Sequence, residues 1–189
     1  MTLTKKLNSE YTDKKIRDCF IQLLLEKEYD EITISSITKR CGINRTTFYL
    51  FYSSKDELLM DICDVFLDWY INNLVEYIAK ISEDNRESLK KTFDELATKA
   101  DVVKAMFTIK GSSYNPYIRM QKQIEEAIYA TIKDNFEDKN KVSLFSKYYA
   151  ANAMATVEWW ILNYKNYSSA YVVDIILLCV NEGISKILR

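Results

Sequence analysis

The sequence predicts an all-α protein, and three observations lead to that fold class. Only three of the 189 residues are glycine and one is proline, so the residues that most often interrupt helices are almost absent. Apolar residues recur three or four positions apart in most segments, which is the spacing of one helix face. Hydrophobic residues make up 48% of the chain and charged residues 28%, a balance that allows a buried core.

Four helices are expected in the first eighty residues. The first covers about residues 13–27, with an inward stripe of Ile16, Phe20, Leu23 and Leu24. After a short loop at 29–31, Thr33 is a candidate N-cap of a second helix, and Gly42 stands where that helix must end in a left-handed turn. Asn44 is a candidate N-cap of a third helix over 45–51. Ser54 and Glu57 form a capping box that opens a long fourth helix, to about residue 81.

The rest of the chain predicts five more helices. We expect them at about 87–100, 102–109 (with Asp101 as N-cap), 116–136 (with Pro116 in its first turn), 142–164 and 169–188. Residues 110–115 form the clearest loop, and 137–141 read as a charged connector. The last two helices are apolar on more than one face, which is typical of helices that pack on a core and on a second surface.

The charge is uneven along the chain, although 26 basic and 27 acidic residues leave a net charge of −1. Residues 32–55 hold four basic residues and no acidic one: Lys39, Arg40, Arg45 and Lys55. Residues 1–17 add five basic residues against two acidic ones. This distribution suits docking of one end of the molecule to a polyanion, although chance clustering on a solvated face would give the same count.

Several classes of protein are excluded by what the sequence lacks. There is no histidine, which removes His-ligated metals and the Ser-His-Asp and Cys-His arrangements. No phosphate-binding glycine motif occurs, and the four cysteines form no C-x-x-C, so we expect no cofactor, no metal site, no catalytic residues and no enzymatic activity. No apolar run is long enough to span a membrane and no secretory signal opens the chain, which favours a cytoplasmic protein without a membrane partner.

The two short helices joined by residues 41–44 predict a helix-turn-helix, whose second helix enters the major groove of DNA. Its outward positions hold Arg45, Thr46, Thr47, Tyr49 and Leu50, while Phe48 and Tyr52 fit the inner face. Arginine is the best bidentate partner of guanine. Hydroxyls of Thr33, Thr47 and Tyr49 suit phosphate oxygens, and Lys55 stands at a helix N-terminus, which also favours phosphate.

Residues 16–59 resemble the N-terminal DNA-binding domain of the TetR family of bacterial repressors. The motifs that carry the resemblance are Ile16-x-x-x-Phe20, Thr33-Ile34-x-x-Ile37-x-x-x-Cys41-Gly42-Ile43 and Thr47-Phe48-Tyr49-x-x-Tyr52-x-Ser54-Lys55-Asp56-Glu57-Leu58. Two residues depart from the family pattern, because Phe51 replaces a polar histidine and Cys41 a small alanine. Residues 145–169 are similar to the C-terminal domain of the family's Firmicutes-type members.

The resemblance implies an all-α homodimer with a DNA-binding domain at 1–56 and a helical ligand-binding and dimerisation domain at 57–189. Position by position, it implies base contacts from Arg45 and Thr46 and phosphate contacts from Tyr49, Lys55, Thr33 and Thr47. The last two helices would pair across the dimer, where we expect Val172, Ile176, Val180 and Ile187. Candidate ligand-binding residues are Trp69, Tyr114 and Trp159, although aromatic stripes more often belong to a core or an interface.

The implied function is that of a ligand-responsive repressor, which binds a palindromic operator in double-stranded DNA as a homodimer and is released by a small molecule. An alternative stays open, a small-molecule-binding or accessory regulatory protein that acts without binding DNA. A helical enzyme is the third candidate, and the absence of histidine disfavours it.

Overall fold

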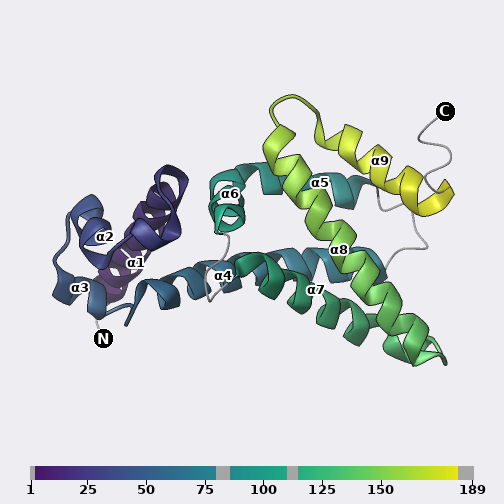
Figure 1. Cartoon of the computed structure of the whole chain (residues 1–189), viewed down its shortest axis with the longest axis horizontal. Helices are drawn as coiled ribbons and strands as arrows, with labels where there is room; N and C mark the ends of the chain where they lie inside the picture. Colours follow the sequence, from purple (N-terminus) through teal and green to yellow (C-terminus); the bar gives the residue numbers. More distant parts are fainter. Residues whose placement is uncertain (1–2, 80–85, 110–114, 183–189) are drawn as a thin grey trace. The chain divides into compact units, whose positions relative to one another are not determined.

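The computed structural model describes residues 3–79, 86–109 and 115–182 of the chain (Figure 1). Every regular element within those ranges is helical, which confirms the all-α fold class. Within the same ranges, no helix combines the length and the apolar character needed to cross a membrane.

The chain divides into two compact units, each with its own core. The first comprises Met1–Leu67 and Asp101–Tyr117, and the second comprises Asp68–Ala100 and Ile118–Arg189. One helix, α4 (Lys55–Ala79), contributes residues to both units. The domain boundary predicted after residue 56 falls in the first turn of this helix.

The first unit contains α1 (Leu3–Glu26), a 3-10 turn η1 (Tyr29–Glu31), α2 (Ile34–Cys41), α3 (Arg45–Tyr49), the start of α4 and most of α6 (Ala100–Thr108). Its fully buried side chains include Ile16, Phe20, Ile37, Phe48 and Leu58. Helix α1 begins ten residues earlier than predicted. No glycine or proline interrupts residues 3–12, so this arm continues the helix.

Side-chain caps fix the ends of the two short helices, as the sequence predicted. The Thr33 hydroxyl accepts from Ser36 N at 3.1 Å, and the Ser36 hydroxyl accepts from Thr33 N at 3.0 Å. Gly42 ends α2 with φ +64°, in the left-handed region that a glycine adopts without strain. Asn44 Oδ1 accepts from Thr47 N at 2.7 Å and opens α3. The turn between the helices is therefore set by local contacts.

The predicted capping box at the start of α4 forms only in part. Ser54 Oγ accepts from Glu57 N at 3.1 Å, as expected. The Glu57 carboxylate, however, accepts from the backbone N of Ser53 at 2.6 Å and not from Ser54. These hydrogen bonds with Ser53, through its hydroxyl and its backbone, lower the pKa of Glu57.

The second unit contains the rest of α4, α5 (Arg86–Thr98), α7 (Pro116–Ile132), η2 (Lys133–Asn135), α8 (Lys139–Asn163) and α9 (Ser169–Glu182). Phe93 and Trp160 meet edge to face in its core, with ring centroids 5.8 Å apart, and Trp160 Nε1 donates to Phe93 O at 3.2 Å. The core of this unit also includes Ile124, Ala150 and Val173, which are completely buried.

Two further helix starts differ from the prediction. Helix α8 begins at Lys139, within the expected connector, because the Asp138 carboxylate caps it by accepting from the backbone N–H groups of Asn140 and Lys141. Asp101 is not an N-cap, since α6 begins at Ala100 and places Asp101 in its first turn. An acidic side chain is favoured both at the N-cap and in the first turn of a helix, so the sequence pattern did not separate these two positions for Asp101.

Candidate functional site

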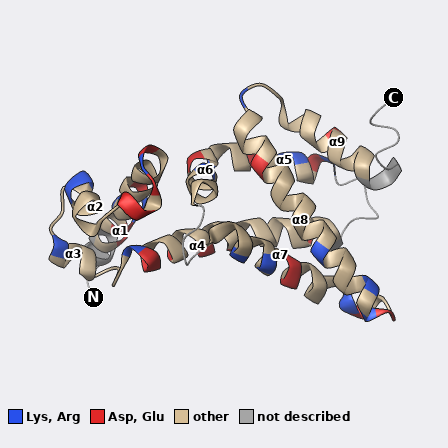
Figure 2. Cartoon of the chain, in the orientation of Figure 1, with Lys and Arg blue, Asp and Glu red and all other residues tan. Residues whose placement is uncertain are grey.

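Helix α3 presents the predicted outward residues to solvent. Arg45 and Thr46 are exposed in its first turn, Thr47 is half-buried, and Tyr49 and Leu50 are 55% and 78% exposed. Basic residues lie in the last turn of α2 and at the start of α3 (Figure 2). The helical spacing thus placed every outward residue of this motif correctly.

The inner face of α3 is anchored by aromatic packing and by a polar cluster. Phe48 is completely buried, and its ring centroid lies 6.0 Å from that of Tyr52. The Tyr52 hydroxyl lies within hydrogen-bond distance of the Asp13 and Asp61 carboxylates and accepts from Arg17 Nε at 3.2 Å. Burial raises the pKa of Tyr52, so its hydroxyl keeps the proton that it donates. Arg17 is therefore a structural residue whose charge is offset by two carboxylates.

Arg40 also directs its charge to a residue of its own chain. Its guanidinium makes two hydrogen bonds to the Glu26 carboxylate of α1, one of them 2.9 Å long. This pairing with Arg40 lowers the pKa of Glu26. Lys39 and Arg45 are exposed and, within the described part of the chain, have no ion-pair partner. Arg45 is thus the basic side chain of α3 whose charge is available to a ligand.

Lys55 holds the turn before α2 against the start of α4. Its Nζ donates to the backbone carbonyls of Tyr29 and Ile32, at 2.8 and 3.0 Å, and lies 4.2 Å from the centroid of the Tyr29 ring. The Tyr29 hydroxyl donates to the Asp56 carboxylate, which adds a second link between the same elements. A lysine has three N–H donors, so one remains for the predicted phosphate contact.

Cys41 fills the position where the TetR pattern has a small residue. It is 1% exposed, and its Sγ lies 3.8 Å from the carbonyl of Lys15 in α1. Burial raises the pKa of this thiol to about 12, so it stays neutral at physiological pH. Phe51, the other departure, is half-buried directly after α3. Neither residue offers a charged or hydroxyl group to a phosphate.

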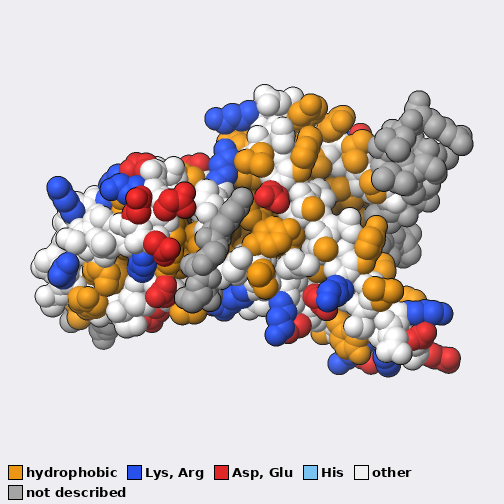
Figure 3. Space-filling model, in the orientation of Figure 1, with side chains coloured by type: hydrophobic (Ala, Val, Ile, Leu, Met, Phe, Trp, Pro, Cys, Tyr) orange, Lys and Arg blue, Asp and Glu red, His pale blue; other side chains and the backbone are white. Residues whose placement is uncertain are grey.

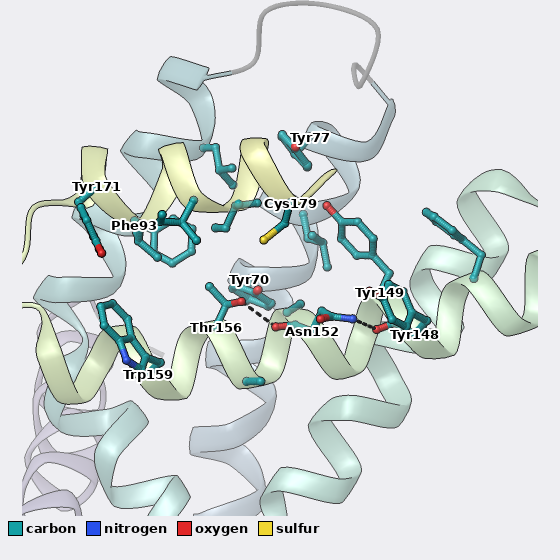
Figure 4. A pocket seen from close by; sticks show the side chains of 18 residues that line it. Tyr70, Tyr77, Phe93, Tyr148, Tyr149, Asn152, Thr156, Trp159, Tyr171 and Cys179 are labelled. Atoms are coloured by element: carbon teal, nitrogen blue, oxygen red, sulfur yellow. Dashed lines mark hydrogen bonds between the residues drawn. The ribbon is translucent and has the colours of Figure 1, made fainter. Parts of the chain in front are cut away.

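The second unit encloses a half-open cavity of about 680 Å³ between α4, α5, α8 and α9 (Figure 4). Tyr70, Leu74 and Tyr77 of α4 line it at helical spacing, i, i+4 and i+7. Helix α8 contributes residues spaced in the same way, among them Tyr149, Asn152, Thr156 and Trp159. None of the 18 lining residues within the described part of the chain carries a charge.

The predicted ligand-binding residues lie in different places. Trp159 lines the cavity and is 41% exposed, with its ring centroid 5.3 Å from that of Tyr167. Trp69 does not line it; its Nε1 donates to Glu95 at 3.0 Å, and Lys99 Nζ lies 4.5 Å from its ring centroid. Tyr114 lies outside the described residues. The tyrosines of α4 and α8 that line the cavity were missed, although in α4 the i, i+4, i+7 spacing of Tyr70, Leu74 and Tyr77 could have indicated them.

The predicted dimer residues of α9 face their own unit where the structure describes them. Val172 is buried and Ile176 half-buried, and both line the cavity. The side chain of Val180 and all of Ile187 lie outside the described residues.

Helix α8, in contrast, exposes a row of apolar side chains on one face. The row consists of Leu144, Tyr148, Ala155, Trp159 and Leu162, spaced as one helical stripe, and we call it the α8 stripe. Leu144 and Leu162 are 71% and 68% exposed. Hydrophobic side chains gather over the visible face of this unit (Figure 3). An exposed apolar row of this length is typical of a helix that packs against a partner.

Two short helices joined by a glycine turn, beside a helical unit with an apolar cavity, are typical of one class of protein, the helix-turn-helix transcription regulators. Residues 21–62 match the model of one family in that class, described as bacterial regulatory proteins, tetR family. This is a family of DNA-binding regulators of transcription and not of enzymes.

Relatives and solved structures agree with the family assignment. The chain is 33% identical over 87 residues to YxbF of Bacillus subtilis strain 168, described as an uncharacterised HTH-type transcriptional regulator; the match covers 46% of this chain and 22% of YxbF. The fold is similar to a TetR transcriptional regulator from Streptococcus agalactiae 2603V (TM-score 0.62, 18% identity, 95% of this chain and 99% of that chain). It is also similar to FadR of Bacillus subtilis, solved with stearoyl-CoA (TM-score 0.64, 18% identity, 90% and 98%).

Proposed function

We propose that the protein is a ligand-responsive repressor, which binds a palindromic operator in double-stranded DNA as a homodimer and releases it when a small molecule occupies the cavity. The observation that carries the proposal is α3, which exposes Arg45, Thr46, Tyr49 and Leu50 while Phe48 anchors its inner face. A repressor of chromosomal genes acts in the bacterial cytoplasm, where we place this protein.

The roles on DNA follow the chemistry of each exposed group. Arg45 and Thr46 are the proposed base-reading residues, since an arginine fork matches guanine and a threonine methyl matches thymine. Leu50 supplies a second apolar contact at the end of α3. Phosphate contacts set the register of the protein on the duplex, and we assign them to Tyr49, Thr33, Thr47 and Lys55.

Binding to DNA is tested by fluorescence anisotropy with a random duplex at several salt concentrations, followed by footprinting on the DNA that flanks the gene. We expect binding that weakens with salt and a protected inverted repeat with half-sites about 34–36 Å apart. Failure to bind any duplex at low salt would remove the repressor function.

The homodimer is proposed to form through the α8 stripe together with α9. Of the predicted α9 contacts, Val172 and Ile176 line the cavity of their own unit, so Val180 and Ile187, which lie outside the described side chains, remain as proposed contacts. Leu144 and Leu162 are the best residues to change, because both are highly exposed and neither lines the cavity. In sedimentation experiments, we expect a dimer for the wild type and a monomer for the Leu144→Asp, Leu162→Asp double variant.

The control for this experiment is Val65→Asp, a change at an apolar residue of α4 that is 54% exposed and lies outside the stripe. It should stay dimeric. If the double variant stays dimeric as well, the interface does not involve the α8 stripe.

Helix α4 offers the route from ligand to DNA. It contributes Lys55 to the first unit and the cavity residues Tyr70, Leu74 and Tyr77 to the second. A ligand that binds one conformation of the protein, with α4 in one position, more tightly than another conformation shifts the population toward the first. The size of the shift is limited by the difference between the ligand's affinities for the two conformations. The expected readout is a ligand-dependent loss of operator binding.

One observation favours the alternative, an accessory regulator that does not bind DNA. Two of the four basic residues at 32–55, Arg40 and Lys55, are engaged within the chain. The anisotropy experiment separates the two functions, because an accessory regulator would bind a ligand but no duplex at any salt concentration.

A further inference from the structure

We infer that the cavity takes an uncharged, largely apolar molecule that contains at least one ring. The inference rests on the proposed function, since it names the chemical class of the ligand to which the repressor responds. Three features of the cavity lining support this ligand class. They are the absence of charge, the share of aromatic side chains and the arrangement of neutral polar groups.

The absence of charge in the lining excludes ionic ligands. All 18 lining residues are neutral, whereas 28% of the whole chain is charged. An anion or cation that leaves water needs an opposite charge or several hydrogen bonds, because unpaired burial of a charge is strongly unfavourable. FadR of Bacillus subtilis was solved with stearoyl-CoA, whose phosphates require such partners. The described lining of this cavity has no lysine or arginine to supply them.

The aromatic share of the lining favours a ligand with a ring. Eight of the lining residues are aromatic, and they come from all four helices that bound the cavity. Figure 4 shows Tyr70 and Tyr149 within the lining, with Trp159 and Tyr171 on α8 and α9 toward one end. Aromatic side chains gain stacked or edge-on contacts from a ring in addition to the gain from apolar burial.

The polar groups of the lining are neutral and few. Asn152 Nδ2 donates to Tyr148 O at 2.8 Å, and Thr156 Oγ1 donates to Asn152 O at 2.8 Å (Figure 4). Tyr77 and Tyr149 add two phenol hydroxyls to the lining. Within the described residues, Asn152 Oδ1 has no hydrogen-bond donor, so it can accept from one hydroxyl or N–H group of a ligand.

Protonation of the tyrosines keeps this lining neutral. Burial raises the pKa of Tyr70 and of Tyr149 above the ordinary value for tyrosine. Neither of these two hydroxyls ionises at physiological pH. The volume of about 680 Å³ lies within the range of small-molecule sites, roughly 300–1,000 Å³.

The test uses two dyes that share a ring system and differ in charge. N-phenyl-1-naphthylamine is neutral, and 8-anilino-1-naphthalenesulfonate carries a sulfonate on the same framework. In fluorescence titrations of the full chain, we expect the neutral dye to bind at least about tenfold more tightly, and stearoyl-CoA not to displace it. Tighter binding of the sulfonate, displacement by stearoyl-CoA, or binding of neither dye would overturn the inference.

Two variants show that the preference belongs to the cavity and not to apolar surfaces in general. Ala153→Trp fills the cavity and should weaken binding of the neutral dye at least about tenfold, whereas Val65→Trp, at an exposed position of the first unit, should not change it. Asn152→Lys adds one cation to the lining at an exposed position and should raise the affinity for the sulfonate relative to the neutral dye. An unchanged ratio in Asn152→Lys means that the dyes bind elsewhere and overturns the inference.

These measurements do not involve DNA, so the inference and the proposed function can fail separately. A protein that binds the operator but not the neutral dye remains a repressor with a different ligand class. A protein that binds the neutral dye with the expected selectivity but no duplex keeps this ligand class and loses the repressor function.

Discussion

The basic residues of the first unit differ in what their charge does. Arg17, Arg40 and Lys55 bind carboxylates or backbone carbonyls of their own chain, whereas Arg45 projects from α3 without an ion-pair partner among the described residues. A count of positive charges in the sequence therefore overstates the charge that is available to DNA. The distinction between structural and available charges gives two predictions.

The Arg45→Ala variant is expected to lose discrimination at one base pair per half-site, because an arginine fork pairs with one guanine. The loss should be about 1–3 kcal/mol. Competition between operators that differ at single positions measures it. Arg40→Ala is the matched control, since it removes the same charge from the same motif but from a side chain already paired with Glu26. A uniform loss across all sequences for Arg45→Ala would identify Arg45 as a phosphate contact.

The Lys55→Ala variant is expected to lower the free energy of unfolding by about 1–3 kcal/mol, because two backbone carbonyls lose their donor. Urea denaturation measures the change. The exposed Lys39, which has no ion-pair partner in the described part of the chain, is the control, and Lys39→Ala should leave stability unchanged. Equal stability of the two variants would mean that the Lys55 contacts contribute nothing in solution.

The sequence predicted the directions of side chains in this unit but not their partners. Helical spacing alone separates Phe48, which is inward, from Arg45 and Tyr49, which are outward. The partner of Arg40 is 14 positions away and that of Lys55 is 26 positions away, so both pairings depend on how the helices pack. No local pattern carries that information.

At the scale of helices and turns, ends that depend on a single local cap could be predicted. Thr33, Gly42 and Asn44 each occupy the expected cap position with the expected geometry. The prediction failed at Asp138, which was assigned to a charged connector and in fact caps α8. It also failed at Asp101, because an acidic residue near a helix start suits both the cap and the first turn. Which of the two forms depends on packing beyond the helix itself.

Gly42→Ala is expected to destabilise the protein by about 1–2 kcal/mol, because its φ of +64° is unfavourable for a residue with a Cβ. No atom lies within 4 Å of the position that the Cβ would occupy, so the cost is that of the backbone alone. Gly42→Asn should cost less, since asparagine tolerates this region. Chemical denaturation of the two variants tests whether Gly42→Ala is the less stable one. A steric clash with the larger side chain would make Gly42→Asn the less stable one.

The contact between Asp94 of α5 and Ser169 of α9 predicts an acid-sensitive step. Hydrogen bonds to Lys90 and to Ser169 lower the pKa of Asp94 from its ordinary value of 3.8. A carboxylate whose pKa is lower in the folded state stabilises the protein above its unfolded-state pKa, and this contribution is lost as the pH falls through the folded-state value. The wild type should therefore lose stability below about pH 4 more steeply than Asp94→Asn.

Urea denaturation at a series of pH values between neutral and strongly acidic measures this difference. The control is Asp18→Asn, at an exposed aspartate that has no hydrogen-bond partner among the described residues. Parallel profiles for Asp94→Asn and the wild type would show that the contacts of Asp94 with Lys90 and Ser169 do not stabilise the protein in solution.

For the whole molecule, the fold class could be predicted from the sequence, whereas the cavity could not. Scarce glycine, scarce proline and helical spacing are enough for an all-α fold. The cavity is built by four helices that are distant in sequence, and its neutral lining becomes visible only when α4, α5, α8 and α9 are brought together. Aromatic content alone indicated Trp159 correctly and Trp69 incorrectly as lining residues.

A dimer formed through the α8 stripe would make the stability of the protein depend on its abundance. If a second copy covers Leu144 and Leu162, dimerisation stabilises the folded state by mass action, and dilution removes that contribution. The midpoint of thermal unfolding should then rise over an about hundredfold increase in protein concentration, and it should stay constant for the Leu144→Asp, Leu162→Asp variant. A regulator made in few copies per cell would thus spend part of its life as a less stable monomer, which proteases degrade more readily. The number of functional dimers would fall more steeply than the rate of synthesis.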